Sequence, residues 1–330
     1  MEKYLLSCDW GSTAFRLRLI EMPGQVIIGE VFSDDGVTRT FNNWKVNAAD
    51  KEITRKQYFI DRLKKQKDLL AAKVSVKLDG IPIVVSGMAS SSIGMQELPY
   101  AMLPFPVNGS GANVQFFEAE GNFSNPVILI SGVRSDQEVM RGEETQLIGI
   151  AELLGLQQQE VLLILPGTHS KHLHIKNGEL VNFQTFMTGE VFGLMINHSI
   201  LKDSVDTDDW TELSESDVEA FRLGVDRSTV SSILNSLFSI RTNDLFDKMN
   251  KHQNALYLSG LLIGNELSTL CAEDAALGLC SSGNLFALYR LALDQLGLLK
   301  KNTILVSAGC FDKAIAAGQI AILNKLTLTL

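Results

Sequence analysis

The sequence predicts an α/β protein of two similar domains. Its 330 residues exceed the size at which one hydrophobic core usually stops growing, about 250–300 residues. A strand, a corner of small polar residues and a hairpin occur twice, near Asp9 and near Gly167. Runs typical of buried strands alternate with helical stretches in both halves. We therefore expect domains at residues 1–158 and 159–330, joined at the Gln-rich stretch 156–160, with a cleft between them.

The first domain is expected to open with an antiparallel meander. Its strands are predicted at 4–8, 15–21 and 25–33. Arg16 and Arg18 alternate with apolar residues, which is the period of a half-exposed strand. Charge and hydropathy then predict a surface helix, two buried strands and a further helix, at 51–72, 81–85, 127–130 and 143–154.

The second domain is expected to begin in the same way and to continue mainly as helices. A buried strand at 161–165 precedes a hairpin whose turn is Asn177-Gly178, a strong hairpin signal. The hairpin strands are predicted at 172–175 and 179–187. Helical patterns follow at 190–201, 215–238, 254–272, 284–296 and 312–323, with short strands at 276–280 and 303–307.

Composition excludes several classes of protein. A 45% apolar and 20% charged chain is typical of a soluble globular protein. The formal net charge of −9 argues against nonspecific nucleic-acid binding, which needs a basic surface. No signal peptide and no apolar run of about 18 residues is evident, so we expect a cytoplasmic protein with no nucleic-acid or membrane partner. The sequence leaves open whether the chain forms a homo-oligomer.

The four cysteines predict neither zinc binding nor disulfide bonds. They lie in apolar stretches, and no two have CxxC spacing. We therefore expect reduced core thiols at Cys8, Cys271, Cys280 and Cys310.

The first candidate site is the turn Asp9-Trp-Gly-Ser-Thr13. Backbone N–H groups and hydroxyls at Gly11, Ser12 and Thr13 can face phosphate oxygens. Asp9 can hold a hydrated Mg²⁺, which prefers carboxylate, water and phosphate ligands. Taken alone, the same turn also fits a plain hairpin.

The second candidate site is Pro166-Gly-Thr-His-Ser170. Gly167 permits close approach of the backbone, the Thr168 and Ser170 hydroxyls add donors, and His169 belongs to the same turn. Taken alone, these residues also fit a simple turn. The turn is not a Walker A loop, because no Gly-Lys-Ser/Thr follows. His169, His172 and His174 alternate, but no carboxylate or cysteine cluster accompanies them, so a metal site is not expected.

Two further motifs open helices. In Met140-Arg-Gly-Glu-Glu-Thr-Gln146, Glu143 and Glu144 either complement the helix dipole or supply a base for phosphoryl transfer. In the stretch 279–284, Ser281, Ser282 and Gly283 either cap a helix or let an adenosine group lie against the backbone.

In this order, the four motifs resemble those of the superfamily that contains sugar kinases, heat-shock ATPases and actin. The resemblance implies two ribonuclease H-like domains of the actin-like ATPase fold, with the active site in the interdomain cleft and with ATP and Mg²⁺ as cofactors. It makes residues 9–13 and 166–170 the two phosphate motifs and 279–283 the adenosine motif. The sugar acid is then expected in the first domain and ATP in the second.

Within this superfamily the chain resembles the 2-dehydro-3-deoxygalactonokinase family. The resemblance rests on six motifs and covers nearly the whole chain; Arg141-Gly-Glu-Glu-Thr-Gln146 and Pro166-Gly-Thr-His169 are its most specific parts. It implies phosphorylation of 2-dehydro-3-deoxy-D-galactonate to its 6-phosphate in galactonate catabolism. Another sugar or sugar-acid kinase of this fold, or an actin-like switch or filament protein, stays open as an alternative.

The resemblance also suggests which residues act. Glu143 directly follows Gly142, where the superfamily connector places an Asp, so Glu143 is the expected base and Glu144 the alternative. Ser281-Ser282 stands where many relatives have Gly-Gly. A bidentate guanidinium suits the acid group of the substrate. The expected substrate contacts are Thr38, Arg39, Ser90, Ser91, Arg134 and Arg141. Each of the three arginines is expected in a loop at the cleft end of a strand.

Overall fold

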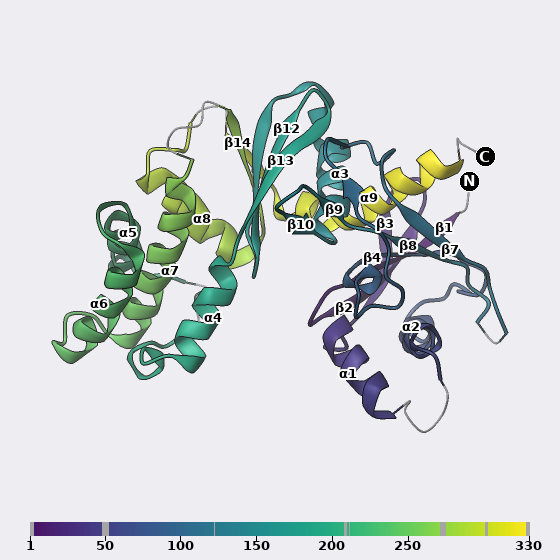
Figure 1. Ribbon diagram of the computed structural model, residues 1–330, viewed down its shortest axis with the longest axis horizontal. Helices are drawn as coiled ribbons and strands as arrows, with labels where there is room; N and C mark the ends of the chain where they lie inside the picture. The colour runs from purple at the N-terminus through teal and green to yellow at the C-terminus, as the bar shows by residue number, and fades with distance from the viewer. Residues whose placement is uncertain are drawn as a thin grey trace. The chain divides into compact units, whose positions relative to one another are not determined.

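The computed structural model describes residues 3–47, 53–121, 123–207, 210, 212–270, 275–300 and 303–327. The chain divides into two compact units (Figure 1). The first unit comprises Met1–Gln159, Lys176–Asn182 and Asp312–Leu330, and the second comprises Glu160–Ile175 and Phe183–Phe311. The first unit therefore contains two segments that lie beyond the expected boundary at residue 158.

The first unit is built on a six-stranded sheet in the order β3-β2-β1-β4-β8-β7. The strands β1, β2 and β3 form the predicted antiparallel meander, and β4 and β8 continue the sheet parallel to β1. Their bounds are β1 Tyr4–Trp10, β2 Phe15–Glu21, β3 Val26–Ser33, β4 Ile83–Gly87, β7 Val114–Phe117 and β8 Val127–Ile130.

The second unit repeats this order as β13-β12-β11-β14-β15. Again three antiparallel strands are followed by two parallel ones. The strands are β11 Val161–Leu165, β12 Ser170–Lys176, β13 Glu179–Phe186, β14 Ala276–Cys280 and β15 Ile304–Val306. The repeated order confirms the predicted α/β class with two ribonuclease H-like cores.

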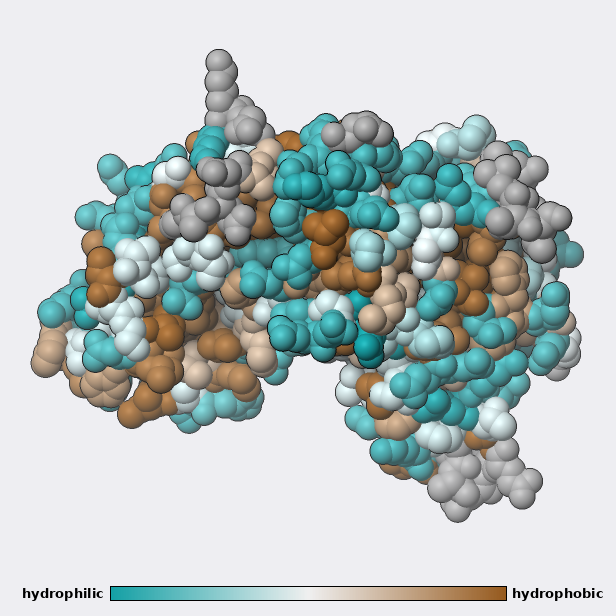
Figure 2. Space-filling model, turned by 45° about the horizontal axis from the view of Figure 1, so that its top comes forward, coloured by the Kyte–Doolittle hydropathy of each residue, from teal (hydrophilic) through white to brown (hydrophobic). Residues whose placement is uncertain are grey.

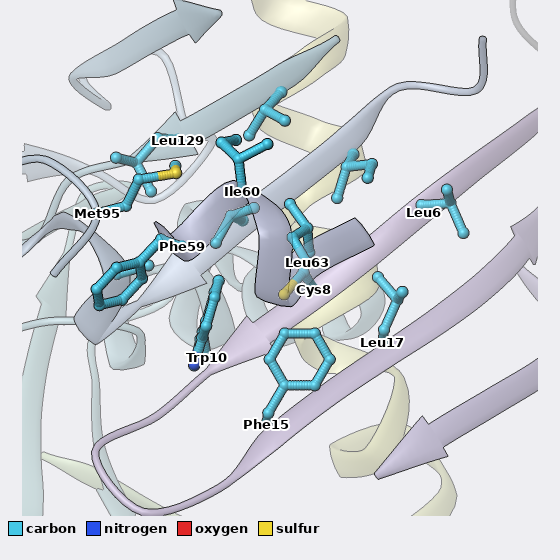
Figure 3. Packing of buried hydrophobic residues seen from close by; sticks show 14 of the residues in the cluster. Leu6, Cys8, Trp10, Phe15, Leu17, Phe59, Ile60, Leu63, Met95 and Leu129 are labelled. Atoms are coloured by element: carbon cyan, nitrogen blue, oxygen red, sulfur yellow. The ribbon is translucent and has the colours of Figure 1, made fainter. Parts of the chain in front are cut away.

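The core of the first unit lies between its sheet and α2 (Arg55–Ala71). Trp10 is fully buried and meets Phe15 edge to face, with ring centroids 4.9 Å apart. Phe59 and Leu63 of α2 pack into the same cluster as Trp10 (Figure 3). Because alternate side chains of a strand point to opposite faces, Cys8 and Trp10 enter this core while Asp9 lies on the other face.

Two helices of the first unit approach each other at glycines. These are α3 (Glu143–Leu154) and the part of α9 (Ala308–Thr327) that belongs to this unit. A Cβ on Gly149 would lie 1.7 Å from the Ala314 carbonyl oxygen, and one on Gly318 would lie 1.9 Å from that of Thr145. Only glycine permits this approach at the two positions.

The described part of the second unit contains five complete helices and the first turn of α9. The complete helices are α4 Thr188–His198, α5 Glu215–Val230, α6 Ile233–Leu245, α7 Lys251–Ser268 and α8 Gly283–Gln295. The prediction of one helix over 215–238 is wrong. Ser231 is extended, with φ −141° and ψ 153°, and Ser232 begins α6. Serine hydroxyls compete for backbone hydrogen bonds and favour helix ends over helix interiors.

Short elements complete the described chain. A small sheet in the order β10-β9-β5 contains β5 Ala101–Met102, β9 Val133–Arg134 and β10 Val139–Met140. The strand β6 (Phe105–Pro106) pairs with the start of β13. Single 3₁₀ turns are η1 Met88–Ser90, η2 Leu156–Gln158 and η3 Lys202–Ser204. No described helix combines the length and apolar character that crossing a membrane would take.

Two sequence expectations in the first unit are wrong. Residues Val37–Asn47 form a helix, α1, that the sequence did not predict. Arg18 is 9% exposed although an exposed face was expected. Its guanidinium bonds Glu30 and donates to the Asp312 carbonyl oxygen at 2.6 Å, and these partners offset the cost of burying its charge.

The cysteines follow the prediction in part. Cys8 and Cys280 are buried thiols, and burial raises the pKa of both. Cys310 is only partly buried. Cys271 lies outside the described residues.

Exposed apolar side chains gather on the helical part of the second unit (Figure 2). Leu194, Ile200, Leu234 and Phe238 belong to this group, with exposed fractions of 44–79%. Exposed apolar groups of this kind are typical of protein contact surfaces.

Candidate active site

The first phosphate-type turn joins β1 to β2 and is held by backbone bonds. The Gly11 N–H donates to the Ala14 carbonyl oxygen at 2.9 Å, which closes the turn. The Val37 N–H donates to the Gly11 carbonyl oxygen at 2.9 Å, and the Thr38 N–H to that of Ser12 at 3.1 Å. The start of α1 therefore supports the turn, and the Ser12 and Thr13 side chains remain exposed.

Glycine is required where α1 meets this turn. A Cβ on Gly36 would lie 2.3 Å from the Thr13 carbonyl carbon, well inside van der Waals contact. The Gly36-Val-Thr-Arg39 motif is therefore part of the same structure as the Asp9–Thr13 motif, although 22 residues separate Gly36 from Thr13 in the sequence. Thr38 is exposed beside Ser12.

Asp9 lies at the end of β1 in a charged neighbourhood. Burial raises the pKa of its carboxyl, the positive charges of Arg16 and Arg18 oppose this rise, and the negative charge of Glu143 adds to it. Arg16 pairs directly opposite Asp9 in the hairpin. Arg16 was not predicted as a site residue, although its position opposite Asp9 follows from the predicted hairpin.

Two glycines bring the start of α3 to the end of β4. Gly142 has φ +105° and Gly87 has φ +93°, conformations that favour glycine. A Cβ on Gly142 would lie 3.2 Å from the Gly87 Cα. Because β4 lies beside β1, with Gly87 paired to Trp10, the first turn of α3 comes close to Asp9. This approach explains the electrostatic effect of Glu143 on Asp9.

The two neighbouring glutamates have different surroundings. Glu144 is 1% exposed, and its two oxygens accept bonds from the Gly142 N–H at 2.7 Å and the Thr145 hydroxyl at 2.9 Å. Burial, aided by the charge of Glu143, raises the pKa of Glu144 to about 7. Glu143 is less buried, and its Oε2 accepts a 3.1 Å bond from the Arg141 N–H. Glu144 thus has the contacts of a helix-capping residue.

Arg141 is the expected substrate arginine with the most contacts. Its Nη1 donates to the Ser90 hydroxyl at 2.7 Å and its Nη2 to the Leu98 carbonyl oxygen at 3.0 Å. The guanidinium lies 3.9 Å from the centroid of the Tyr100 ring. Among the described residues, the buried Nε of Arg141 and the buried Oγ of Ser91 have no hydrogen-bond partner. This group therefore has polar atoms available to a ligand.

The other two arginines occupy different positions. The sequence placed both in loops, which is wrong: Arg39 lies on α1 and Arg134 on β9. The Arg39 side chain is 62% exposed and 3.7 Å from Asp35, and Arg134 donates to the Met102 sulfur. The described structure brings Arg141 to Ser90, the neighbour of Ser91 in the chain, whereas the contacts of Arg39 and Arg134 are with Asp35 and Met102.

The second phosphate-type turn joins β11 to β12 and is held by the first turn of α4. A Cβ on Gly189 would lie 2.7 Å from the Gly167 carbonyl oxygen. The Glu190 N–H donates to the Thr168 carbonyl oxygen at 3.0 Å, and the Glu190 carboxylate pairs with His169 Nε2. The exposed Thr168 and His169 therefore sit on a turn fixed by another helix.

A mainly apolar cavity of about 120 Å³ lies beside this turn in the second unit. Its lining residues are Gly167, Thr188, Gly189, Phe192, Trp210, Ser259, Leu262, Ile263, Leu285 and Tyr289. The last two belong to α8, which begins directly after Ser281 and Ser282. Ser282 holds the N-cap position without a side-chain capping bond, and Gly283 has φ +59°. The adenosine-type motif thus leads into a wall of the cavity.

The described residues contain no group of three or more His, Cys, Asp or Glu side chains arranged for a metal ion. Asp9 supplies one carboxylate, and Mg²⁺ usually takes one or two carboxylates and completes its shell with water and phosphate. The negative charge of Glu143 raises the pKa of the Asp9 carboxyl, and a cation beside Asp9 would oppose this effect.

Residues 9–320 match the family model of 2-keto-3-deoxy-galactonokinase. The chain belongs to this kinase family. A relative from Rhizobium meliloti (strain 1021), named "Probable 2-dehydro-3-deoxygalactonokinase DgoK1", is 31% identical over 96% of each chain. The 2-dehydro-3-deoxygalactonokinase of Escherichia coli (strain K12) is 28% identical over 88% of this chain and 90% of its own.

A solved structure agrees with this assignment. The solved chain described as "Crystal structure of a putative 2-dehydro-3-deoxygalactonokinase protein from Sinorhizobium meliloti" superposes with a TM-score of 0.76. It is 29% identical in sequence and covers 97% of this chain and 96% of its own. The family resemblance, the kinase class and the fold class predicted from the sequence are confirmed.

Proposed function

We propose that this chain transfers the terminal phosphoryl group of ATP to the 6-hydroxyl of 2-dehydro-3-deoxy-D-galactonate. The products are the 6-phosphate and ADP, as in galactonate catabolism. The observation that carries the proposal is the family match over residues 9–320, with relatives of that name aligned over almost their whole length. We place the reaction in the cytoplasm, where ATP is available.

The second unit is proposed to bind the nucleotide. Backbone N–H groups of Gly167, Thr168 and His169 face the phosphates in this proposal, because the turn is fixed and its polar side chains are exposed. The adenine and ribose occupy the apolar cavity and the backbone of Ser281, Ser282 and Gly283. The cavity supports this role because its apolar walls suit a planar base.

The first unit is proposed to bind the sugar acid and to activate it. Glu143 accepts the proton of the attacking hydroxyl, the hydroxyl oxygen forms the new P–O bond, and the bond to the ADP oxygen breaks as ADP leaves. Asp9 would hold Mg²⁺ through water beside Gly11, Ser12 and Thr13. The bound ion neutralises negative charge on the transferred group.

The carboxylate of the substrate is proposed to bind Arg141. Ser90 and Ser91 are proposed to form hydrogen bonds with its oxygens or with nearby hydroxyls. Three observations support this choice over Arg39 and Arg134. The guanidinium is oriented by two hydrogen bonds and a ring, it adjoins buried serines, and its Nε has no partner among the described residues. Thr38 and Arg39 remain proposed as outer contacts beside the first turn.

The test is ADP release in a coupled assay with a panel of acceptors. Mg-ATP and 2-dehydro-3-deoxy-D-galactonate should give rapid turnover, and the matching neutral sugar should react at least tenfold more slowly. An unpaired buried donor typically costs about 1–3 kcal/mol, which is the reason for that difference. Equal turnover of glycerol or galactose would show another sugar kinase. ADP release without any acceptor, or polymerisation with ATP, would show a switch or filament protein.

A further inference from the structure

A buried glutamate of the second unit lies directly beneath the proposed nucleotide turn. Glu266, near the end of α7, is 2% exposed. No lysine or arginine pairs with it among the described ion pairs; its partner there is His172. Burying a carboxylate in this way is costly unless other groups donate hydrogen bonds to it.

Four donors meet this one carboxylate. Oε1 accepts bonds from the Ser170 hydroxyl at 2.7 Å and His172 Nε2 at 2.9 Å. Oε2 accepts bonds from the Tyr289 hydroxyl at 2.7 Å and the Thr188 hydroxyl. A carboxylate has about four acceptor positions, so all of them are filled. Burial raises the pKa of Tyr289 well above its usual range, which keeps its hydroxyl protonated and able to donate.

The four donors come from the structures that surround the proposed nucleotide site. Ser170 ends the 166–170 turn and begins β12, which also contains His172. Thr188 begins α4, and Tyr289 belongs to α8. Thr188 and Tyr289 also line the apolar cavity. In Figure 1, α4, α7 and α8 lie in the same helical part of this unit. One carboxylate therefore connects the phosphate turn, the helix that supports it and the cavity wall.

We propose that Glu266 is the positioning residue of the nucleotide site, fixing the 166–170 turn and the start of α4 relative to the apolar cavity. The inference rests on the proposed nucleotide role of that turn. Because the Ser170 and Thr188 hydroxyls donate to Glu266, they present only acceptor lone pairs to other groups. Donors for the phosphates then come from the backbone of the turn and from Thr168.

The decisive variant is Glu266→Gln. A glutamine has one acceptor oxygen and one NH₂ group, so two of the four donors would face another donor. The turn should shift, and small displacements at a reacting group reduce rates strongly. We expect the KM for ATP to rise about tenfold or more and kcat to fall, with an unchanged KM for the sugar acid. Thr188→Val, which keeps shape and removes one donor, should give a smaller change in the same direction.

The matched control is Asp244→Asn. Asp244 also accepts bonds from a serine, Ser204, and from Arg241 in the same unit, and it lies outside the turn and the cavity. This variant should keep the parental KM values although it too replaces a hydrogen-bonded carboxylate by an amide. A general loss of stability would change the KM values of both variants alike. A rise in the KM for ATP in Glu266→Gln alone would therefore identify a positioning role.

The experiment measures steady-state constants for both substrates and, by calorimetry, Mg-ADP affinity without an acceptor. Weaker Mg-ADP binding by folded Glu266→Gln supports the proposal. So does a loss of Mg-ADP binding free energy in the double variant Glu266→Gln/Thr188→Val that is smaller than the sum of the two single losses. Parental Mg-ADP affinity and KM in that folded variant would overturn it. If Glu266→Gln does not fold, Thr188→Val and Tyr289→Phe decide by the same measurement. Failure of the parent to use the sugar acid would refute the proposed substrate alone, because Mg-ADP binding is measured independently.

Discussion

Glu144 gives the chain a pH-dependent stability that a single substitution should remove. Burial raises the pKa of Glu144 to about 7 in the folded state, from the value of 4.5 that is usual for a glutamate in an unfolded chain. Between these values the unfolded chain has released the proton and the folded chain keeps it. The contribution of Glu144 to stability is therefore fully present below about pH 4.5 and is lost as the pH rises through 7.

The size of the effect follows from the shift. Each pKa unit corresponds to about 1.4 kcal/mol, so a rise from 4.5 to about 7 predicts a loss of about 3 kcal/mol between pH 4 and pH 8. Glu144→Gln cannot ionise, and its amide oxygen can still accept the Gly142 N–H bond. The free energy of unfolding of the variant, relative to the parent, should therefore increase by about 3 kcal/mol over this pH range.

Urea unfolding at several pH values, followed by tryptophan fluorescence, measures this difference. Trp10 and Trp44, two of the three tryptophans, lie in the first unit with Glu144. Glu152→Gln on the same helix is the control, since Glu152 is exposed, and its pH dependence should follow the parent. Parallel curves for the parent and Glu144→Gln would refute the reasoning, because they would show that burial does not retain the proton.

Three further predictions concern activity. Glu143→Gln should lower turnover roughly 10²-fold with Mg-ATP binding retained; parental turnover would remove the base role from Glu143. Asp9→Asn should abolish turnover in a protein that still folds, and initial rates at several Mg²⁺ concentrations that match the parent would contradict the metal role. Gly189→Ala should raise the KM for ATP, because its Cβ would lie 2.7 Å from the Gly167 carbonyl oxygen. Gly193→Ala, one helical turn later with no atom within 4 Å of its Cβ, should leave that KM unchanged. An equal KM for ATP in the two variants would show that the contact with Gly167 is not the cause.

Most elements of the fold could be predicted because their signals are local. The helix α3 begins and ends at the predicted residues, between Gly142 and the left-handed Gly155. The helix α1 was missed because Val, Thr and Asn are weak helix formers, and burial of Val37 and Thr40 stabilises it instead. Such tertiary contacts leave no periodic pattern in a short segment.

Long-range partners explain why parts of the site were not predicted. Arg18 is buried because Asp312, 294 residues away in sequence, offers a carbonyl oxygen. The two phosphate-type turns were found from their small residues, which are contiguous. Arg16 could have been found from its pairing with Asp9. Glu266 carried no such signal, because Ser170 and Tyr289 reach it from distant parts of the chain.

The two turns occupy the same position in their sheets but are held by different interactions. Backbone N–H groups of Val37 and Thr38 hold the turn between β1 and β2. Side chains hold much of the turn between β11 and β12, through Glu266 and Glu190. Most residues can supply a backbone bond, whereas a side-chain bond needs one residue type. Substitutions far from the turn, on α4 or α7, should therefore disturb the turn between β11 and β12 more often than distant substitutions disturb the turn between β1 and β2.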